Sequence, residues 1–253
     1  MRRAAAWAAA ALCLCAAAHP DSAALFRLGK FADAAEAGRA EHTANSLALA
    51  ARAALTRAAF LTTDRDEAKA LVLQGEADAD AALKLDPRNY DALFQRASGI
   101  GYRATLSNSP KLAIQTKTIF TALTKADPTR PEAWLGLGAW NGEAVDNVGR
   151  FMAGMVLGAK LSAMEAAFAE AERRMAQSPV PFAYHGCLLL RIDPAQSDRA
   201  RALLSQATRL RAREAYEATA QRGASEVLAL LARGDVRAAR DMAKRLGSFG
   251  KLA

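Results

Sequence analysis

Two Asp-Pro pairs constrain the fold of this chain more than any other feature of its sequence. Asp86-Pro87 and Asp127-Pro128 lie 41 residues apart, and each separates a run of helix-forming residues from a second run that begins about three residues later. Proline cannot continue a helix, and it suits a position just past the end of one helix or in the first turn of the next. The interval holds two helices and two short turns, so the pairs predict a repeated helical unit.

The remaining sequence also predicts helices. Alanine, leucine, arginine and glutamate dominate, and apolar residues recur at intervals of three and four rather than two. Gly29 and Gly234 each precede a similar helix start, which indicates that each glycine ends the helix before it. The predicted helices are 21–28, 31–42, 45–61, 65–85, 90–106, 110–126, 131–146, 148–157, 161–176, 181–191, 198–212, 214–232 and 235–246. Because a single pair cannot bury its apolar stripe, we expect one all-α domain over 19–253, built as a right-handed superhelix of antiparallel pairs.

The segment around Trp134 resembles the tetratricopeptide repeat. Trp134, Leu137-Gly138 and Trp140 follow the pattern of the first helix of that repeat, and Pro128 stands where the preceding unit ends. The neighbouring unit matches less well, and its spacing of 41 residues exceeds the usual 34 of the family. A weaker likeness, over Ala133 to Ala159 and residues 167–172, is to the repeat domain of the regulator of microtubule dynamics family. This second resemblance implies only a scaffold fold.

The first eighteen residues are typical of a secretory signal peptide. Arg2 and Arg3 precede an apolar stretch at 4–15 and a small-residue site at 16–18, and the stretch is too short to span a bilayer. We therefore expect residues 1–18 to be removed and the protein to reach the periplasm or the exterior. The exported chain would keep Cys187 as its one cysteine and could form no internal disulfide.

Positive charge concentrates near the C-terminus. Residues 199–253 hold 12 basic and 5 acidic side chains, within a formal net charge of +8 for the whole chain. An exported protein is not expected to meet nucleic acid. Residues 199–245 therefore predict contact with an anionic membrane surface or an acidic partner, or else an ordinary solvated helix face. Apolar residues recur in this segment at helical spacing, and they are predicted to turn inward. They are Ala200, Leu203, Leu204, Ala207 and Leu210.

Six glycines between 136 and 158 invite comparison with a phosphate-binding loop. Such a loop requires a preceding strand, and the sequence predicts none. We expect these glycines, including the Gly154 and Gly158 pair, to let helices pack closely. An alternative is that Phe151, Met152 and Met155 line a small apolar pocket.

No arrangement of residues predicts catalysis. His185 and Cys187 are two positions apart, so on a helix they point to different sides, and we expect both to serve packing. The histidines are scattered without the spacing of metal ligands, and no cofactor motif is present. The sequence predicts a non-enzymatic protein without metal or cofactor.

The resemblance to tetratricopeptide repeats implies a concave groove that binds a protein or peptide. In that family the groove is lined by positions beside the core stripe of the first helix of each unit. Acidic side chains at such positions would favour a basic segment of the partner. The predicted surface consists of Asp91, Phe94, Ser98, Tyr102, Glu132, Leu135, Ala139 and Glu143. The alternative prediction is an exported helical protein that binds a small molecule or lipid, for example an accessory subunit of a solute transporter. A peptide-binding protein would have an open groove, whereas a protein that binds a small molecule would have an enclosed cavity.

Overall fold

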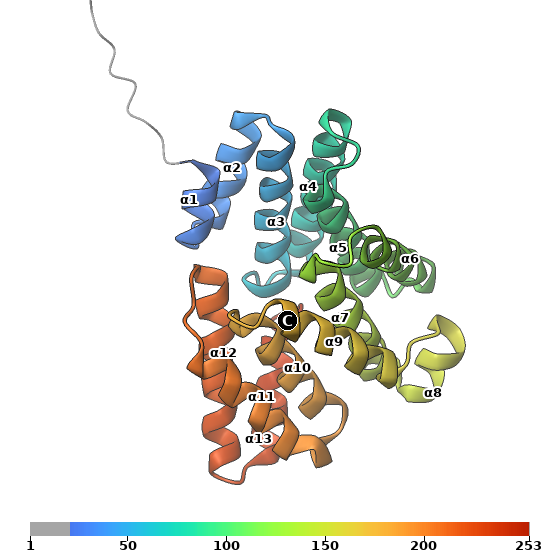
Figure 1. Ribbon diagram of the computed structural model, residues 1–253, viewed down its shortest axis with the longest axis vertical. Helices are drawn as coiled ribbons and strands as arrows, with labels where there is room; N and C mark the ends of the chain where they lie inside the picture. Colours follow the sequence, from blue (N-terminus) through green and yellow to red (C-terminus); the bar gives the residue numbers. More distant parts are fainter. Residues whose placement is uncertain (1–20, 253) are drawn as a thin grey trace, which may run out of the picture.

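The computed structural model describes residues 21–252, and the predicted signal peptide at 1–18 lies outside this range. The described chain is helical without strands, which confirms the all-α class (Figure 1). Its helices are α1 (Ser22–Arg27), α2 (Phe31–Glu41), α3 (Ala44–Phe60), α4 (Arg65–Leu85), α5 (Tyr90–Ser107), α6 (Pro110–Ala126), α7 (Pro131–Val148), α8 (Arg150–Met152), the π-helical turn η1 (Ala153–Leu157), α9 (Leu161–Arg174), α10 (Pro179–Ile192), the 3-10 turn η2 (Pro194–Gln196), α11 (Ser197–Arg209), α12 (Ala215–Ala232) and α13 (Val236–Leu246).

Both Asp-Pro pairs lie in the turns where they were expected. Asp86 follows α4 and Asp127 follows α6, and each carboxylate accepts a hydrogen bond from a backbone N–H two residues on, at 3.0 Å. The next helix then begins with a capping Asn89 side chain in one unit and with Pro131 in the other. Gly29 and Gly234 adopt φ of 78° and 77° directly after α1 and α12, as the sequence predicted.

Each helix packs mainly on its neighbours in sequence, and α10 makes further contacts with α7, α12 and α13. In Figure 1, α1 to α6 form the upper part of the molecule and α9 to α13 the lower part, with the C-terminal end of the chain between them. The first helices also meet a late one, because α1 contacts α12. The chain therefore turns back on itself rather than extending in one direction.

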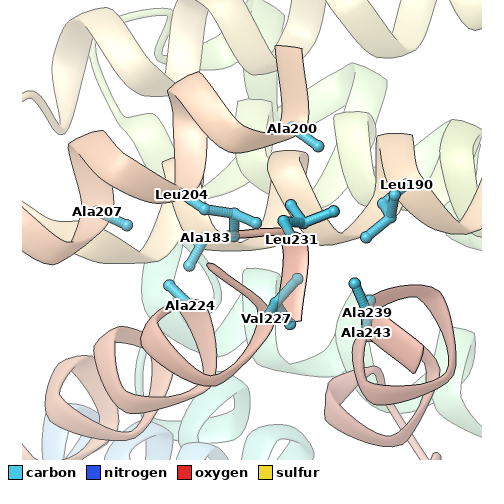
Figure 2. Close-up of a cluster of buried hydrophobic side chains, with 10 residues drawn as sticks. All are labelled: Ala183, Leu190, Ala200, Leu204, Ala207, Ala224, Val227, Leu231, Ala239 and Ala243. Carbon is cyan, nitrogen blue, oxygen red and sulfur yellow. The ribbon is translucent and has the colours of Figure 1, made fainter. Parts of the chain in front are cut away.

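The buried core between α10, α11, α12 and α13 is built from small and medium-sized side chains (Figure 2). Ala200, Leu204 and Ala207 are fully buried in it, which confirms their predicted inward orientation, whereas Leu203 and Leu210 are only half-buried. Gly138 and Gly142 of α7 lie against Phe168 of α9 and Leu188 of α10. Glycine in these positions permits the close helix contact that the sequence predicted.

The segment that follows α7 differs from its prediction. In place of a continuous helix over 148–157, the three residues of α8 lead into η1, and Gly158 closes the turn with φ of 66°. A Cβ on Gly154 would meet only Ala159 O, at 3.7 Å, so the expected close packing at Gly154 and Gly158 was wrong. The predicted pocket wall was also wrong, because Phe151 is 75% exposed and Met155 is 64% exposed. The apolar side chains here point to solvent because no other helix covers them.

No single helix within residues 21–252 is both long enough and apolar enough to cross a bilayer. The segment Arg150–Leu157 together with Leu161–Arg174 meets that test by length and composition, but the two parts are bent by 85°. In α9 the apolar side chains Met164, Ala167, Phe168 and Ala171 are buried within the fold.

The close contact of α7 with α9 and α10 predicts a difference between two glycine variants. Gly142→Ala places a Cβ in steric overlap with Leu188 and 2.8 Å from Met164 Sδ, both fully buried, so it should lower the free energy of unfolding by about 1–3 kcal/mol. The Cβ of Gly154→Ala would make only an ordinary van der Waals contact with Ala159 O, so this variant should leave stability unchanged or slightly raised. Urea unfolding followed by circular dichroism checks this, and equal stabilities of the two variants would contradict it.

Candidate functional site

The predicted binding residues of α5 are each in contact with other parts of the chain. Asp91 is paired with Arg130, and the ring of Phe94 lies 5.5 Å from that of Phe120 in α6. Ser98 donates a hydrogen bond to the carbonyl of Phe94, at 2.9 Å. The structure therefore leaves only the carboxylate of Asp91 largely exposed in this half of the surface.

The same holds for the predicted residues of α7. Glu132 accepts a hydrogen bond from Arg130 Nε at 3.1 Å, so one arginine joins the acidic ends of α5 and α7. Leu135 packs against the cluster around Phe168, and Ala139 is half-buried. Glu143 accepts the Tyr184 hydroxyl, at 2.8 Å, and also pairs with an arginine of α10. The structure brings Asp91 and Glu132 together through Arg130 but does not gather the eight residues into one open surface. Whether they bind a partner stays a prediction.

The C-terminal segment 247–252 occupies the space beside Tyr102. The ring of Phe249 meets the ring of Tyr102 edge-on at 5.3 Å, and the Phe249 N–H donates to the carbonyl of Ala59, at 2.7 Å. Phe249 and Leu252 both pack against a cluster contributed by α3, α4 and α5. Burial raises the pKa of the Tyr102 hydroxyl. The tail thus covers an apolar surface on the inner side of the N-terminal helices.

A half-enclosed cavity lies next to this tail, between the N-terminal and C-terminal helices. Its volume is about 90 Å³, and it is partly open to solvent. Its walls come from α2 and α3, from α10, and from α12, α13 and the tail. The apolar and aromatic residues that line it include Phe31, Phe60, Leu61, Val180, Tyr216 and Leu246. We call this space the central cavity.

The charged residues that line the central cavity are all cations. They are Arg191, Arg245 and Lys251, and no aspartate or glutamate is among the lining residues. Arg245 and Lys251 are exposed, and no carboxylate of the described residues pairs with either. The cavity therefore combines apolar walls with positive charge at its opening.

Arg191 differs from the other two cations because its charge is balanced within the fold. Its Nη2 lies 2.7 Å from Glu143 Oε2 and 2.6 Å from Asp146 Oδ2, which ties α10 to α7. Burial by itself would lower the pKa of Arg191, but the two carboxylates outweigh that effect and the pKa is raised. Its guanidinium also lies against Gly247, where a Cβ would come within 2.6 Å of Nη1. Arg191 therefore fixes the tail and the cavity wall rather than offering a free charge.

Tyr216 closes the cavity on the side where the early and late helices meet. Its ring packs edge-on against Phe60 at 5.9 Å, and Arg52 lies between it and Phe26. Arg52 also pairs with Glu214, at 2.5 Å, just before α12. These contacts join α1 and α3 to α12.

His185 and Cys187 point to different surroundings, as predicted. The imidazole of His185 is buried, stacks on Phe168 at 4.4 Å and lies 2.7 Å from Glu172, on the side of α9. Cys187 instead lines the central cavity, and burial raises the pKa of its thiol to about 12. Across residues 21–252, no group of three or more His, Cys, Asp or Glu side chains is arranged to hold a metal ion.

Sequence reasoning missed the central cavity because its residues come from separate segments of the chain. The lining runs from Phe31 to Lys251 and has no local spacing that a motif could reveal. One signal was available, since Arg245 and Lys251 belong to the basic C-terminal region, but the sequence did not show that they meet α3 and α10. No protein-family model matches the chain, and no curated protein matches it.

The contact between Tyr102 and Phe249 predicts measurable coupling. Tyr102→Ala should lower the free energy of unfolding by up to about 3 kcal/mol, the lower end of the range for a core aromatic residue, because Tyr102 is half-buried. In a double-mutant cycle with Phe249→Ala, the coupling energy should be about 0.5–1.5 kcal/mol, the usual value for an edge-on aromatic pair. A second cycle, in which Phe151→Ala replaces Phe249→Ala, serves as control. Because Phe151 is exposed, its coupling energy with Tyr102→Ala should be near zero. A stable, uncoupled Tyr102→Ala variant would instead support a free binding surface at Tyr102.

The raised pKa of Cys187 predicts a slow thiol reaction in the folded protein. Only the thiolate reacts with iodoacetamide, and a thiol with a pKa of about 12 is almost entirely protonated at pH 8. In a chain with Cys13→Ser and Cys15→Ser, alkylation of Cys187 should be at least about tenfold slower than in urea. Mass spectrometry measures both rates, and equal rates would show that the thiol is not buried.

Proposed function

We propose that this chain is a non-catalytic binding protein whose central cavity holds a small amphiphile with an apolar body and an acidic head group. The observation that carries the proposal is the composition of the cavity, which has apolar and aromatic walls and cations without carboxylates among its lining residues. Sites for small molecules are mostly apolar, with a few polar groups that fix orientation.

The positions of the charges favour a negatively charged head group at the opening. Arg245 and Lys251 are exposed, while the apolar residues of α3, α10 and α12 line the interior. A ligand with an apolar chain would bury that chain against Phe60, Leu61 and Val180 and leave its acidic group near the two cations. The deeper Arg191 has its charge balanced by Glu143 and Asp146, so its site does not demand an anion.

The proposal includes the fold type and location that the sequence suggests. The helix pairs around the two Asp-Pro turns support a right-handed superhelix similar to tetratricopeptide repeats, and the first eighteen residues support export. In this setting the protein would carry or present an amphiphile outside the cytoplasm, as an accessory subunit of a solute transporter would.

Titration with ten-carbon amphiphiles tests the cavity. By isothermal titration calorimetry below the micelle concentration, decanoate should bind more tightly than decanol, and decyltrimethylammonium should bind least. Arg245→Glu combined with Lys251→Glu should weaken decanoate binding by about tenfold or more, equivalent to about 1.4 kcal/mol.

The matched control reverses two exposed cations of α13 that do not line the cavity. Arg237→Glu combined with Lys244→Glu changes the net charge by the same amount and should leave decanoate affinity nearly unchanged. If both double variants weaken binding equally, the effect comes from overall charge. If decanoate does not bind at all, the proposed ligand class is wrong.

The alternative that the chain binds a protein or peptide is favoured by one observation. The tail 247–252 lies as an irregular segment on the inner side of α3 and α5, with Phe249 and Leu252 in apolar contacts. A partner peptide with similar side chains would compete with this tail, and the exposed Asp91 together with the half-buried Glu132 would favour a basic segment next to it.

Charge reversal on the two acids tests this second candidate. Asp91→Lys combined with Glu132→Lys should abolish co-purification of a partner identified by mass spectrometry, while Asp66→Lys combined with Asp80→Lys, at exposed acids of α4, should not. Retention of the partner by both variants would rule out the predicted surface.

A further inference from the structure

Five large apolar side chains are exposed together on the segment that links α7 to α9. They are Val148 at 50%, Phe151 at 75%, Met152 at 44%, Met155 at 64% and Val156 at 44% exposed. The segment stands at the edge of the molecule, where α8 projects beyond the other helices (Figure 1). We call it the apolar knuckle, residues 148–158. Exposed apolar residues scattered singly are ordinary, but a contiguous group of them marks an interaction site.

The surroundings of the apolar knuckle are basic. Residues 147–164 contain Arg150 and Lys160 but no aspartate or glutamate, and residues 92–126 contain five cations and again no acid. The second of these ranges includes α6, which contacts η1, and Lys117 Nζ donates to the carbonyl of Gly158 at 2.7 Å. Ile114, three residues before Lys117 on α6, is 44% exposed. The knuckle and α6 thus form one surface with apolar and cationic groups.

The nearest carboxylates are engaged elsewhere. Asp146 is paired with the buried Arg191 of α10. Glu165 and Asp193 line a small depression with Arg150, but Glu165 is paired with Arg199 and Asp193 caps the backbone of Ala195. The cations Lys111, Lys117 and Lys160 have no carboxylate partner among the described residues. A surface of this kind attracts an anionic partner, because its cations outnumber the carboxylates beside it and those carboxylates have partners of their own.

We propose that the apolar knuckle inserts into the head-group layer of an anionic bilayer, with the cations of α6 and Lys160 at the lipid phosphates. Apolar side chains that project from a folded protein gain free energy by entering the boundary between head groups and acyl chains. Lysine and arginine near an anionic membrane surface each add electrostatic attraction to the lipid head groups. Long side chains such as Lys160 can keep their charge among the head groups while their methylenes follow the apolar residues. Because the cations around the apolar knuckle attract negative charge, this surface favours an anionic bilayer over a neutral apolar protein surface.

This surface is distinct from the one that the sequence predicted for membrane contact. The C-terminal segment 199–245 is basic, but its large apolar residues turn inward, whereas the knuckle presents both chemical features to solvent. It is also separate from the central cavity, since no residue of 148–158 lines that cavity. The two proposals can therefore fail independently.

Vesicle binding of the full chain tests the proposal. Sedimentation with vesicles of phosphatidylglycerol and phosphatidylcholine should show binding that increases with phosphatidylglycerol and weakens with salt. Phe151→Ser combined with Met155→Ser should weaken binding by about tenfold or more, and so should Lys111→Glu combined with Lys160→Glu. All variants keep the same residues 1–20, so the contribution of that segment cancels.

Two control variants separate the knuckle from other surfaces. Leu28→Ser combined with Leu73→Ser removes exposed apolar residues elsewhere and should leave binding unchanged. Arg209→Glu combined with Arg211→Glu tests the C-terminal surface and should have less effect than the lysine pair at the knuckle. If this second control abolishes binding while the knuckle variants bind normally, the proposal is overturned.

Hydrogen exchange gives a local measurement that does not depend on the variants. Adding phosphatidylglycerol vesicles should slow amide exchange within 148–158 and at the start of α6. Unchanged amide exchange there in the bound protein would overturn the proposal. Protection of the same residues without lipid, by self-association that increases with protein concentration, would also overturn it, because it would indicate an interface between protein copies.

Discussion

The close approach of helices through small side chains is the constraint on which the rest of this structure depends. Alanine accounts for more than half of the buried apolar residues, so neighbouring helices have little side-chain volume between them. At the tightest contacts even alanine is too large, and Gly138 and Gly142 allow Phe168 and Leu188 to lie directly against the backbone of α7. These close contacts build several clusters of buried apolar residues, without disulfides between the described residues.

The central cavity exists because the two ends of this helical array are joined by polar contacts that small side chains could not provide. Arg52 lies between Phe26 and Tyr216 and pairs with Glu214, which connects the first helices to α12. Arg191 pairs with two carboxylates of α7 and lies against Gly247, which fixes the start of the tail. Removal of one partner from a buried ion pair such as that of Arg191 usually costs about 3–5 kcal/mol, so the wall of the cavity depends on this charge network.

The central cavity and the apolar knuckle share the chemical features that suit an anionic amphiphile. Both combine apolar groups with cations and lack carboxylates, in one case around an enclosed space and in the other on a projecting surface. An anionic amphiphile therefore matches the interior as a single molecule and the knuckle as a bilayer. A protein that meets its ligand at a membrane would need both features, and their separate positions allow the cavity to stay open to solvent while the knuckle contacts lipid.

The sequence by itself determined the helical class and nearly every helix boundary, because helix propensity, capping residues and Asp-Pro breaks act over a few residues. It also determined the inward positions of Ala200, Leu204 and Ala207, since apolar spacing records which face is buried. Only the tertiary structure decided that Tyr102 meets Phe249, that Glu143 pairs with Arg191, and that Phe151 and Met155 face solvent. Each of these depends on which distant segment, if any, lies beside a given helix face, and the local pattern of a helix carries no information about that.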